Sequence, residues 1–382
     1  MSDFDLKEIR EEHFEDEPTG IEVEHDEEPR ATRASDREEI RVSTKQFSIR
    51  QVMDQIDDGD LELAPDFQRN QVWKPWQKSG LVESILLQIP LPAFYFAETP
   101  EGLLRVVDGL QRLSTVHSFM RQEGFALTGL EYLESEVGGK TFRELELPWR
   151  RRMDNTQIFA HVIDPKTPAR VTYDIFKRIN TGGTPLKPQE IRHSMSAQRS
   201  RDFLKSCTAL PEFHRATWGS LRNSARMDDR EVVLRFCAFR LLGVDGYLES
   251  TRRSTEAFLL EATKWLDDPQ MVDDAALHGL RQDFSRAMIN AQLVFGSYAF
   301  RKWPEGNEAH SPINKALFES WSFALSQLTP EQATKRGPQI VAAARKLMTD
   351  DTKYLAAVTV STGDPAKVEL RFRVATVLVA AA

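Results

Sequence analysis

A cluster of polar side chains stands where an apolar strand gives way to a helix, in the segment VVDGLQRLSTV at residues 106–116. The polar and glycine residues of this segment are Asp108, Gly109, Gln111, Arg112, Ser114 and Thr115. A helix N-terminus presents unpaired backbone N–H groups and a partial positive charge, so such a turn suits an anion. The chemistry that the segment predicts is the binding of a phosphate ester.

Each residue type has a reason to be in a phosphate site. Gly109 allows a tight turn and the close approach of a ligand, and the planar guanidinium of Arg112 matches phosphate oxygens. Ser114 and Thr115 are expected in the first helical turn, as donors to the same anion. The carboxylate of Asp108 would repel an anion unless it binds a divalent cation such as Mg²⁺, orients Arg112, or acts as a base on water. One alternative stays open, in which Asp108 caps the helix and Arg112 pairs with a carboxylate.

Two further polar loops have the same character. The segment PDFQRNQVW, at residues 65–73, offers Gln68, Arg69 and Trp73 just before a helix. The segment FKRINTGGTP, at residues 176–185, ends a helix at a glycine pair, which by itself is an ordinary C-cap. The candidate ligand-binding residues of this second loop are Arg178, Asn180, Gly182 and Gly183. Three such loops favour one composite site.

The elements that must position these loops form a small α/β unit. A short strand and a helix are predicted within residues 43–63, and a second helix within residues 78–90, where apolar residues recur at helical spacing. Two strands joined by a turn are predicted at residues 92–98 and 103–108. A third helix follows at residues 112–120. The order strand, helix, helix, strand, strand, helix has no internal repeat.

Composition divides the 382 residues into three parts. Residues 1–39 are highly charged and poor in large apolar residues, so we expect a disordered acidic tail. Residues 1–40 carry 16 acidic and 5 basic side chains, which leaves 42 acidic and 45 basic ones and hence a mildly basic body. The α/β domain would occupy residues 40–195. Amphipathic patterns then predict a mainly helical domain over residues 196–382.

The cysteines and the hydropathy indicate where the protein works. Cys207 and Cys237 lack the spacing of metal ligands, so we expect buried thiols in a reducing compartment. No apolar run reaches the length of a membrane span, and the acidic N-terminus is unlike a signal peptide. These features predict a soluble, cytoplasmic protein with no membrane partner.

Four motifs carry a family resemblance: FQRNQVW, LVESILLQIPLPAFYF, VVDGLQRLSTV and FKRINTGGTPLKPQEIR. In order and character they resemble the N-terminal domain family of the GmrSD restriction system, also called domain of unknown function 262, over residues 45–200. The resemblance implies an α+β fold class, with a small ParB/sulfiredoxin-like α/β domain followed by an α-helical bundle. It also implies nucleotide binding and hydrolysis within anti-phage defence.

The hallmark of that family is Asp-Gly-Gln-Gln-Arg. The corresponding residues here are Asp108, Gly109, Leu110, Gln111 and Arg112. Leu110 stands in place of the first Gln of the hallmark, so one amide contact of the family is missing. Gln68 and Arg69 stand where the family has an earlier Gln-Arg pair, and the resemblance implies that they form a second wall of the pocket.

The leading hypothesis is a Mg²⁺-dependent NTP-hydrolysing module of a restriction-type system. Arg112, Arg69 and the helix N-terminus would hold the phosphates, Asp108 would position Mg²⁺ or the attacking water, and Gln111 would orient one of them. The HNH nuclease that family members often carry is not recognisable in this chain. The expected partners are therefore the nucleotide, DNA, and a nuclease or other defence protein, with the oligomeric state left open.

Two other classes of function stay open. In one, the protein is a non-catalytic switch that binds a nucleotide or modified DNA and cleaves nothing. In the other, basic helices around Arg215, Arg222, Arg226 and Arg230 follow the phosphates of DNA. Acidic residues are interleaved with these arginines, which favours a salt-bridged helix face instead.

Overall fold

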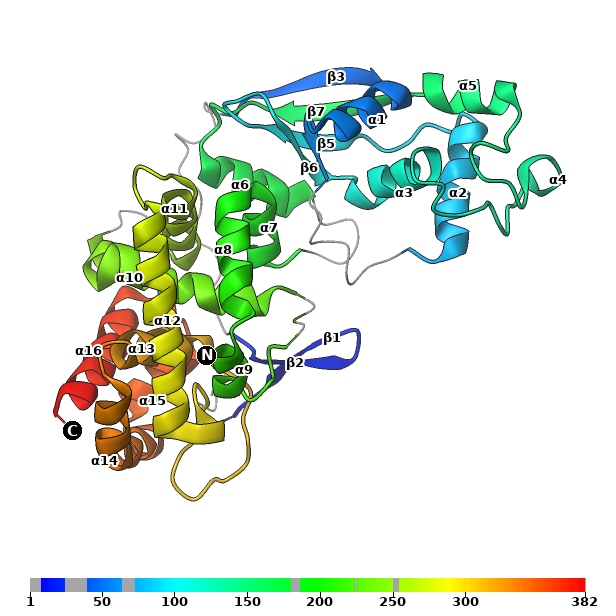
Figure 1. Cartoon of the computed structure of the whole chain (residues 1–382). Coiled ribbons are helices and arrows are strands. Elements are labelled where there is room, and N and C mark those ends of the chain that lie inside the picture. Colours follow the sequence, from blue (N-terminus) through cyan, green and yellow to red (C-terminus); the bar gives the residue numbers. More distant parts are fainter. Residues whose placement is uncertain are drawn as a thin grey trace, which may run out of the picture. The chain divides into compact units, whose positions relative to one another are not determined.

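The computed structural model describes residues 8–24, 40–63, 73–179, 186–222, 224, 226–249 and 254–381. The chain divides into two compact units, one of Thr32–Met195 and one that combines Met1–Ala31 with Ser196–Ala382. Figure 1 shows the first as a sheet with helices and the second as a set of packed helices.

The first unit is built on a five-stranded sheet in the order β3–β7–β5–β6–β4. Its strands are β3 (Val42–Ser48), β4 (Leu61–Glu62), β5 (Phe94–Glu98), β6 (Leu104–Asp108) and β7 (Gln157–Ile163). β3 is antiparallel to β7 and β5 to β6, whereas β5 with β7 and β4 with β6 are parallel pairs. Since parallel neighbours end at the same edge of a sheet, the chain leaves β4 at the edge where β6 ends.

One face of this sheet makes the core of the first unit. The helices of the unit are α1 (Ile49–Asp58), α2 (Pro75–Leu86), α3 (Leu110–Met120), α4 (Glu134–Val137), α5 (Leu147–Asn155), α6 (Ala169–Ile179) and α7 (Pro188–Met195). Buried residues of β5, β6 and β7, such as Phe96, Val106 and Ala160, pack with apolar residues of α1, α2, α3 and α5. The predicted order of strand, helix, helix, strand, strand, helix is confirmed, with β4 as an additional short strand.

The described residues within 196–382 are mainly helical, as the amphipathic patterns predict. The helices of the second unit are α8 (Gln198–Thr208), α9 (Pro211–Ala216), α10 (Asp228–Glu249), α11 (Thr255–Asp267), α12 (Asp274–Phe295), η3 (Gly296–Tyr298), α13 (Lys315–Leu325), α14 (Pro330–Asp350), α15 (Thr352–Thr359) and α16 (Pro365–Ala381). Ten of the eleven residues of α13 are buried, so this helix is the centre of the unit.

Within the described residues, no helix combines the length and the apolar composition that crossing a membrane requires.

An N-terminal hairpin also belongs to the second unit. Strands β1 (Glu11–Phe14) and β2 (Glu17–Glu22) pair antiparallel. Ile21 is 1% exposed, the amide of Ile313 donates to the Gly20 carbonyl at 2.8 Å, and Lys302 pairs with Glu22 at 2.5 Å. The expectation of a disordered acidic tail over residues 1–39 is therefore wrong for residues 8–24, and the rest of that range lies outside the described residues. The composition of residues 1–39 gives the number of acidic side chains, but it does not show that buried cations elsewhere in the chain pair with some of them.

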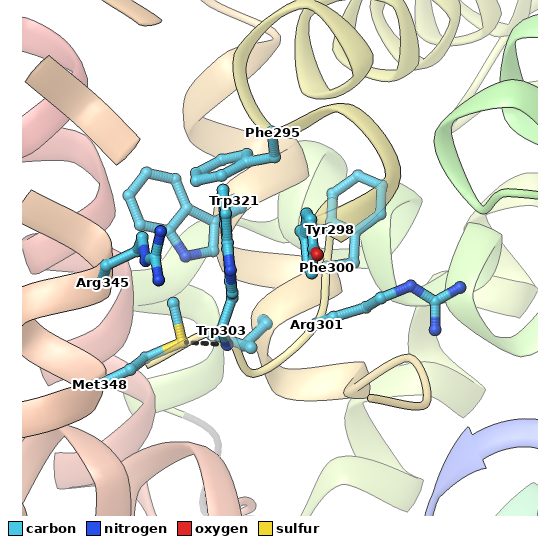
Figure 2. Close-up of a pocket in the computed structure, with 9 residues that line it drawn as sticks. Phe295, Tyr298, Phe300, Arg301, Trp303, Trp321, Arg345 and Met348 are labelled. Carbon is cyan, nitrogen blue, oxygen red and sulfur yellow. Dashed lines mark hydrogen bonds between the residues drawn. The ribbon is translucent and has the colours of Figure 1, made fainter. Parts of the chain in front are cut away.

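A small aromatic pocket lies in the core of the second unit (Figure 2). Tyr298 stacks on Trp303 with ring centroids 4.0 Å apart, and the guanidinium of Arg345 lies 4.3 Å from the Trp303 centroid. Phe295 packs edge-on against Trp321 beside them. The cavity of about 10 Å³ holds roughly one water molecule, so this pocket belongs to the core and is no ligand site.

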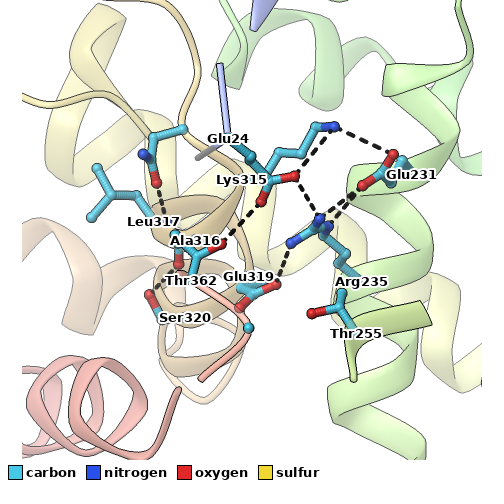
Figure 3. A network of polar contacts seen from close by, with 12 residues as sticks. Glu24, Glu231, Arg235, Thr255, Lys315, Ala316, Leu317, Glu319, Ser320 and Thr362 are labelled. Atoms are coloured by element: carbon cyan, nitrogen blue, oxygen red, sulfur yellow. Dashed lines mark hydrogen bonds and ion pairs between the residues drawn. The ribbon is translucent and has the colours of Figure 1, made fainter. Parts of the chain in front are cut away.

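Buried charges join the hairpin segment to the helices of the second unit (Figure 3). Arg235 of α10 donates to Glu24 at 2.9 Å, to Glu231 at 2.8 Å and to Glu319 at 3.2 Å. Lys315 of α13 lies 3.7 Å from Glu24 and 3.3 Å from Glu231. Burial by itself would lower the pKa of Lys315, but the surrounding carboxylates outweigh it and raise that pKa. Each buried cation is thus compensated by several carboxylates.

The substitution Glu319→Gln is expected to destabilise the protein strongly. Glu319 is 1% exposed and accepts from Arg235 and, at 3.0 Å, from Nε of Arg371. Losing its charge leaves the buried guanidinium of Arg371 without its carboxylate and removes one of the three carboxylates that compensate Arg235, which costs roughly 3–5 kcal/mol of unfolding free energy. Urea denaturation followed by circular dichroism measures this loss.

Glu308→Gln is the matched control in the same unit. The Glu308 carboxylate pairs with Arg345 at 2.7 Å, but its side chain is 63% exposed. Water screens such a pair, so the control is expected to change the unfolding free energy far less. Equal losses in the two variants would show that burial of the charge network contributes nothing.

Both cysteines are buried and unpaired, which confirms the expectation from the sequence. Burial raises the pKa of Cys207 to about 12 and holds the pKa of Cys237 well above its usual range. Both groups are therefore protonated thiols at pH 8, and the thiolate is the reactive form. Ellman's reagent is expected to leave the native protein unmodified and to label two thiols after unfolding. Rapid native labelling would contradict the burial.

Candidate functional site

The polar segment of the sequence forms a strand-to-helix turn, as predicted. β6 ends at Asp108, Gly109 adopts a left-handed backbone with φ 95° and ψ 11°, and α3 begins at Leu110. The first amides of α3 have no partner within their own helix. Gly109 offers no side chain to cap them. The turn therefore presents backbone donors and the positive end of a helix dipole.

Glycine is required at position 109 for two independent reasons. A positive φ is costly for any residue with a Cβ. A Cβ added to Gly109 would also clash with Cδ1 of Phe94, lie 2.8 Å from its Cε1 and lie 3.1 Å from a terminal nitrogen of Arg112. The buried ring of Phe94 therefore fills the space in which the side chain would stand.

A β-bulge decides which way Asp108 points. Phe96 pairs with Val106, but Tyr95 pairs with Asp108, so Val107 is an extra residue in β6. A bulge of this kind shifts the residues that follow it onto the other face of the sheet. Asp108 thereby lies on the face opposite the one that Phe96 and Val106 bury in the core.

Arg112 is held by groups of the protein itself. Its Nη2 donates to Asp108 Oδ2 at 2.8 Å and to the Ala93 carbonyl at 3.3 Å, and its Nη1 donates to the Pro92 carbonyl at 2.5 Å. Its guanidinium carbon lies 4.2 Å from the centroid of the Phe94 ring. Burial lowers the pKa of Arg112, while Asp108 opposes that shift. Of the alternative in which Asp108 caps the helix and Arg112 pairs with a carboxylate, the structure contains the pairing, whereas the N-cap of α3 is Gly109 and not Asp108.

Asp108 keeps one oxygen available. Its Oδ2 accepts from Arg112, and its side chain is 36% exposed. No described residue donates to its Oδ1. Arg112 thus holds the carboxylate through one oxygen, and the partly exposed side chain leaves the other oxygen without a partner among the described residues. The arrangement makes Arg112 a positioning residue for Asp108.

The hydroxyls of α3 lie further along the helix than expected. Because α3 begins at Leu110, Ser114 and Thr115 occupy its second turn, and the expectation of first-turn donors is wrong. Thr115 is 4% exposed and faces the interior. Ser114 and Gln111 are partly buried and each already has a polar contact. An anion at the helix N-terminus would meet backbone amides before these side chains.

The other predicted ligand residues are only partly within the described chain. Trp73 is half-buried and packs against the core of the first unit, and Arg178 is exposed in the last turn of α6. The remaining predicted residues, which lie outside the described residues, are Gln68, Arg69, Asn180, Gly182 and Gly183.

Polar residues of α7 were not predicted. Gln189, Glu190, Arg192 and His193 are each at most 7% exposed, and Nε of Arg192 donates to Gln189 at 2.9 Å. α7 packs against β6, where Arg105 donates to the Met195 carbonyl at 3.0 Å. The available signal was the composition of this short helix, in which polar residues outnumber apolar ones.

The described residues contain no group of three or more His, Cys, Asp or Glu side chains arranged to hold a metal. The carboxylate of Asp108 is the candidate metal ligand at this turn. Mg²⁺ is commonly bound by one or two carboxylates and completes its octahedron with phosphate oxygens and water, so one oxygen of Asp108 suits that mode of binding.

The comparison with known families matches the part of the chain that contains the turn at Asp108. Residues 49–196 match the model of the GmrSD restriction endonuclease N-terminal domain. The match runs from the start of α1 to just past α7 and includes the whole turn at Asp108. Searches of curated proteins and of solved structures gave no match.

The substitution Gly109→Ala is expected to lower stability more than the same change at another left-handed glycine. The positive φ costs about 1–2 kcal/mol, and the clash with Phe94 adds roughly 1–3 kcal/mol of overpacking. Thermal unfolding and urea titration measure both contributions together.

Gly59→Ala in the same unit isolates the contribution of the clash. Gly59 has φ 83° at the C-cap of α1, and an added Cβ there meets nothing within 4 Å. Only the backbone cost should appear in this variant. Similar losses in the two variants would mean that the Phe94 ring moves aside without cost.

Proposed function

We propose that the chain is a nucleotide-binding module of a restriction-type or anti-phage defence system, and that it hydrolyses the nucleotide. The observation that carries this proposal is the turn at the N-terminus of α3, where Gly109 adopts a left-handed backbone and provides no capping side chain, and where Arg112 holds one oxygen of the Asp108 carboxylate. The match of residues 49–196 to the GmrSD N-terminal domain supports the biological setting. The likeness to ParB and sulfiredoxin and a cytoplasmic location remain predictions.

The amides of α3 would bind the terminal phosphate, where the helix dipole stabilises its charge. Arg112 would hold the Asp108 carboxylate and the carbonyls of Pro92 and Ala93 in place, and would add positive charge beside the phosphate. Mg²⁺, when bound, would neutralise phosphate charge. Gln111, one residue before Arg112, would help to orient the ligand or the attacking water.

Asp108 would orient the water that attacks the terminal phosphorus. A bond forms between the water oxygen and phosphorus, the bond from phosphorus to the bridging oxygen breaks, and the nucleoside diphosphate leaves with that electron pair. The proton of the water passes to Asp108 Oδ1 and then to solvent. In-line displacement of this type depends on positioning and on charge stabilisation.

A non-catalytic switch is the second candidate. Leu110 stands where the family hallmark has an amide, and the described residues contain no group of three or more His, Cys, Asp or Glu side chains arranged to hold a metal. The missing amide and the missing metal-binding group would each have assisted hydrolysis. The groups proposed to bind phosphate are still present. Such a switch would act on DNA or on a partner such as a nuclease.

The substitution Asp108→Asn separates the two candidates. It keeps the size of the side chain and removes the charge and the base, so hydrolysis is expected to fall by about 10² or more while nucleotide still binds. Phosphate release from ATP, GTP, CTP and UTP with Mg²⁺, with and without DNA, measures turnover, and calorimetry measures binding.

Asp58→Asn serves as the control, because Asp58 is an exposed residue at the end of α1. It should retain full turnover. Binding without turnover in the unmodified protein would favour the switch. Absence of binding for every nucleotide would refute both candidates.

A further inference from the structure

A row of polar and aromatic residues crosses the sheet beside Asp108. Thr44 of β3 pairs with His161 of β7, His161 pairs with Tyr95 of β5, and Tyr95 pairs with Asp108 of β6. Directly paired residues point to the same face of a sheet. The four side chains therefore share the face opposite the apolar core, and it is the bulge at Val107 that brings Asp108 into this row.

Exposure along β7 shows where this face opens to solvent. Ile163 is 1% exposed, His161 is partly exposed, and Phe159 is 52% exposed. These three residues alternate with buried ones and point to the same side. The contact of Arg105 with the Met195 carbonyl indicates that α7 covers the row nearer Ile163. Exposure rises along β7 away from Ile163, so the row with Asp108 and the aromatic residues beside it lie towards the more exposed end of this face.

Three polar atoms in this row have no partner among the described residues: Asp108 Oδ1, the Tyr95 hydroxyl and His161 Nε2. The other nitrogen of His161, Nδ1, lies 3.0 Å from the Thr44 hydroxyl. When Thr44 donates to Nδ1, Nε2 carries the ring proton and is a donor. The Tyr95 and His161 rings pack with centroids 4.8 Å apart. The face thus combines a continuous aromatic surface with hydrogen-bonding groups that no described side chain uses.

We infer that Tyr95, His161 and Phe159 form the surface that binds the base of the nucleotide, with its phosphates at the N-terminus of α3. This inference rests on the proposed function and extends its site. Adjacent strands are about 4.8 Å apart, so His161 lies about 10 Å from Asp108 across two strand spacings. A nucleoside triphosphate spans such a distance between its terminal phosphate and its base. Aromatic side chains stack on bases, and the Tyr95 hydroxyl and His161 Nε2 would bond to the sugar or the base edge.

The charges on this face favour a single nucleotide over a nucleic acid strand. A strand-binding groove carries cations that follow the phosphate backbone. The row from Thr44 to Asp108 contains no Lys or Arg, and Arg105 in the next row is already paired with Glu62 at 3.1 Å. The α3 end of the row offers instead the partial positive charge of a helix N-terminus, where the phosphates of one nucleotide would lie.

The test compares a nucleotide with a phosphate chain that has no base. Calorimetry on the full chain would measure the affinity for the tightest of ATP, GTP, CTP and UTP, and for inorganic tripolyphosphate. Tyr95→Leu and His161→Ala should each weaken nucleotide binding roughly tenfold, because base stacking is lost, and leave tripolyphosphate binding unchanged. Tyr132→Leu is the matched control, since Tyr132 is 67% exposed elsewhere in the same unit. It should change neither affinity.

The outcomes separate the two proposals. Unchanged nucleotide affinity in Tyr95→Leu and His161→Ala would overturn the base-binding surface and leave the proposed function intact. Equal loss of nucleotide and tripolyphosphate affinity would reveal a structural role and would also overturn it. Loss of binding to a single-stranded oligonucleotide, with nucleotide binding unchanged, would identify a nucleic acid strand as the occupant instead. Failure of the unmodified protein to bind either probe would refute the proposed function and this inference with it.

Discussion

The close contact between Gly109 and the ring of Phe94 is the constraint on which the candidate site depends. The ring occupies the space that any side chain at position 109 would need. The guanidinium of Arg112 lies over the same ring, where the aromatic quadrupole attracts a cation. From there Arg112 reaches both Asp108 and the carbonyls of residues 92 and 93. The orientation of the carboxylate is therefore set by packing as much as by charge.

The sheet of the first unit serves two purposes on its two faces. One face, with Phe96 and Val106, is buried against helices and provides the stability that holds the strands in register. The other face has polar and aromatic residues in one row that ends at Asp108. A single extra residue in β6, Val107, connects the two, because without the bulge Asp108 would fall on the buried side.

The second unit combines two stretches of the sequence, one that precedes the first unit and one that follows it. Glu22 and Glu24 compensate Lys302, Arg235 and Lys315, which lie hundreds of residues later. Buried cations are costly without their partners, so the helical unit depends on the short segment that precedes the sheet. Two chain connections consequently join the units, one before β3 and one after α7.

The sequence by itself determined the local features: the strand-to-helix turn, the order of elements in the first unit, the helical second unit and the buried thiols. Turn chemistry and apolar spacing depend on residues that are close together in the sequence, so they can be recognised without knowing the fold. Only the tertiary structure decided the partners of Arg112, the docking of the hairpin, the burial of the polar helix α7, and the row that joins Asp108 to Tyr95 and His161. The physical reason is that strand register and the pairing of buried charges depend on residues far apart in the chain, and one extra residue in a strand reverses which face a side chain occupies.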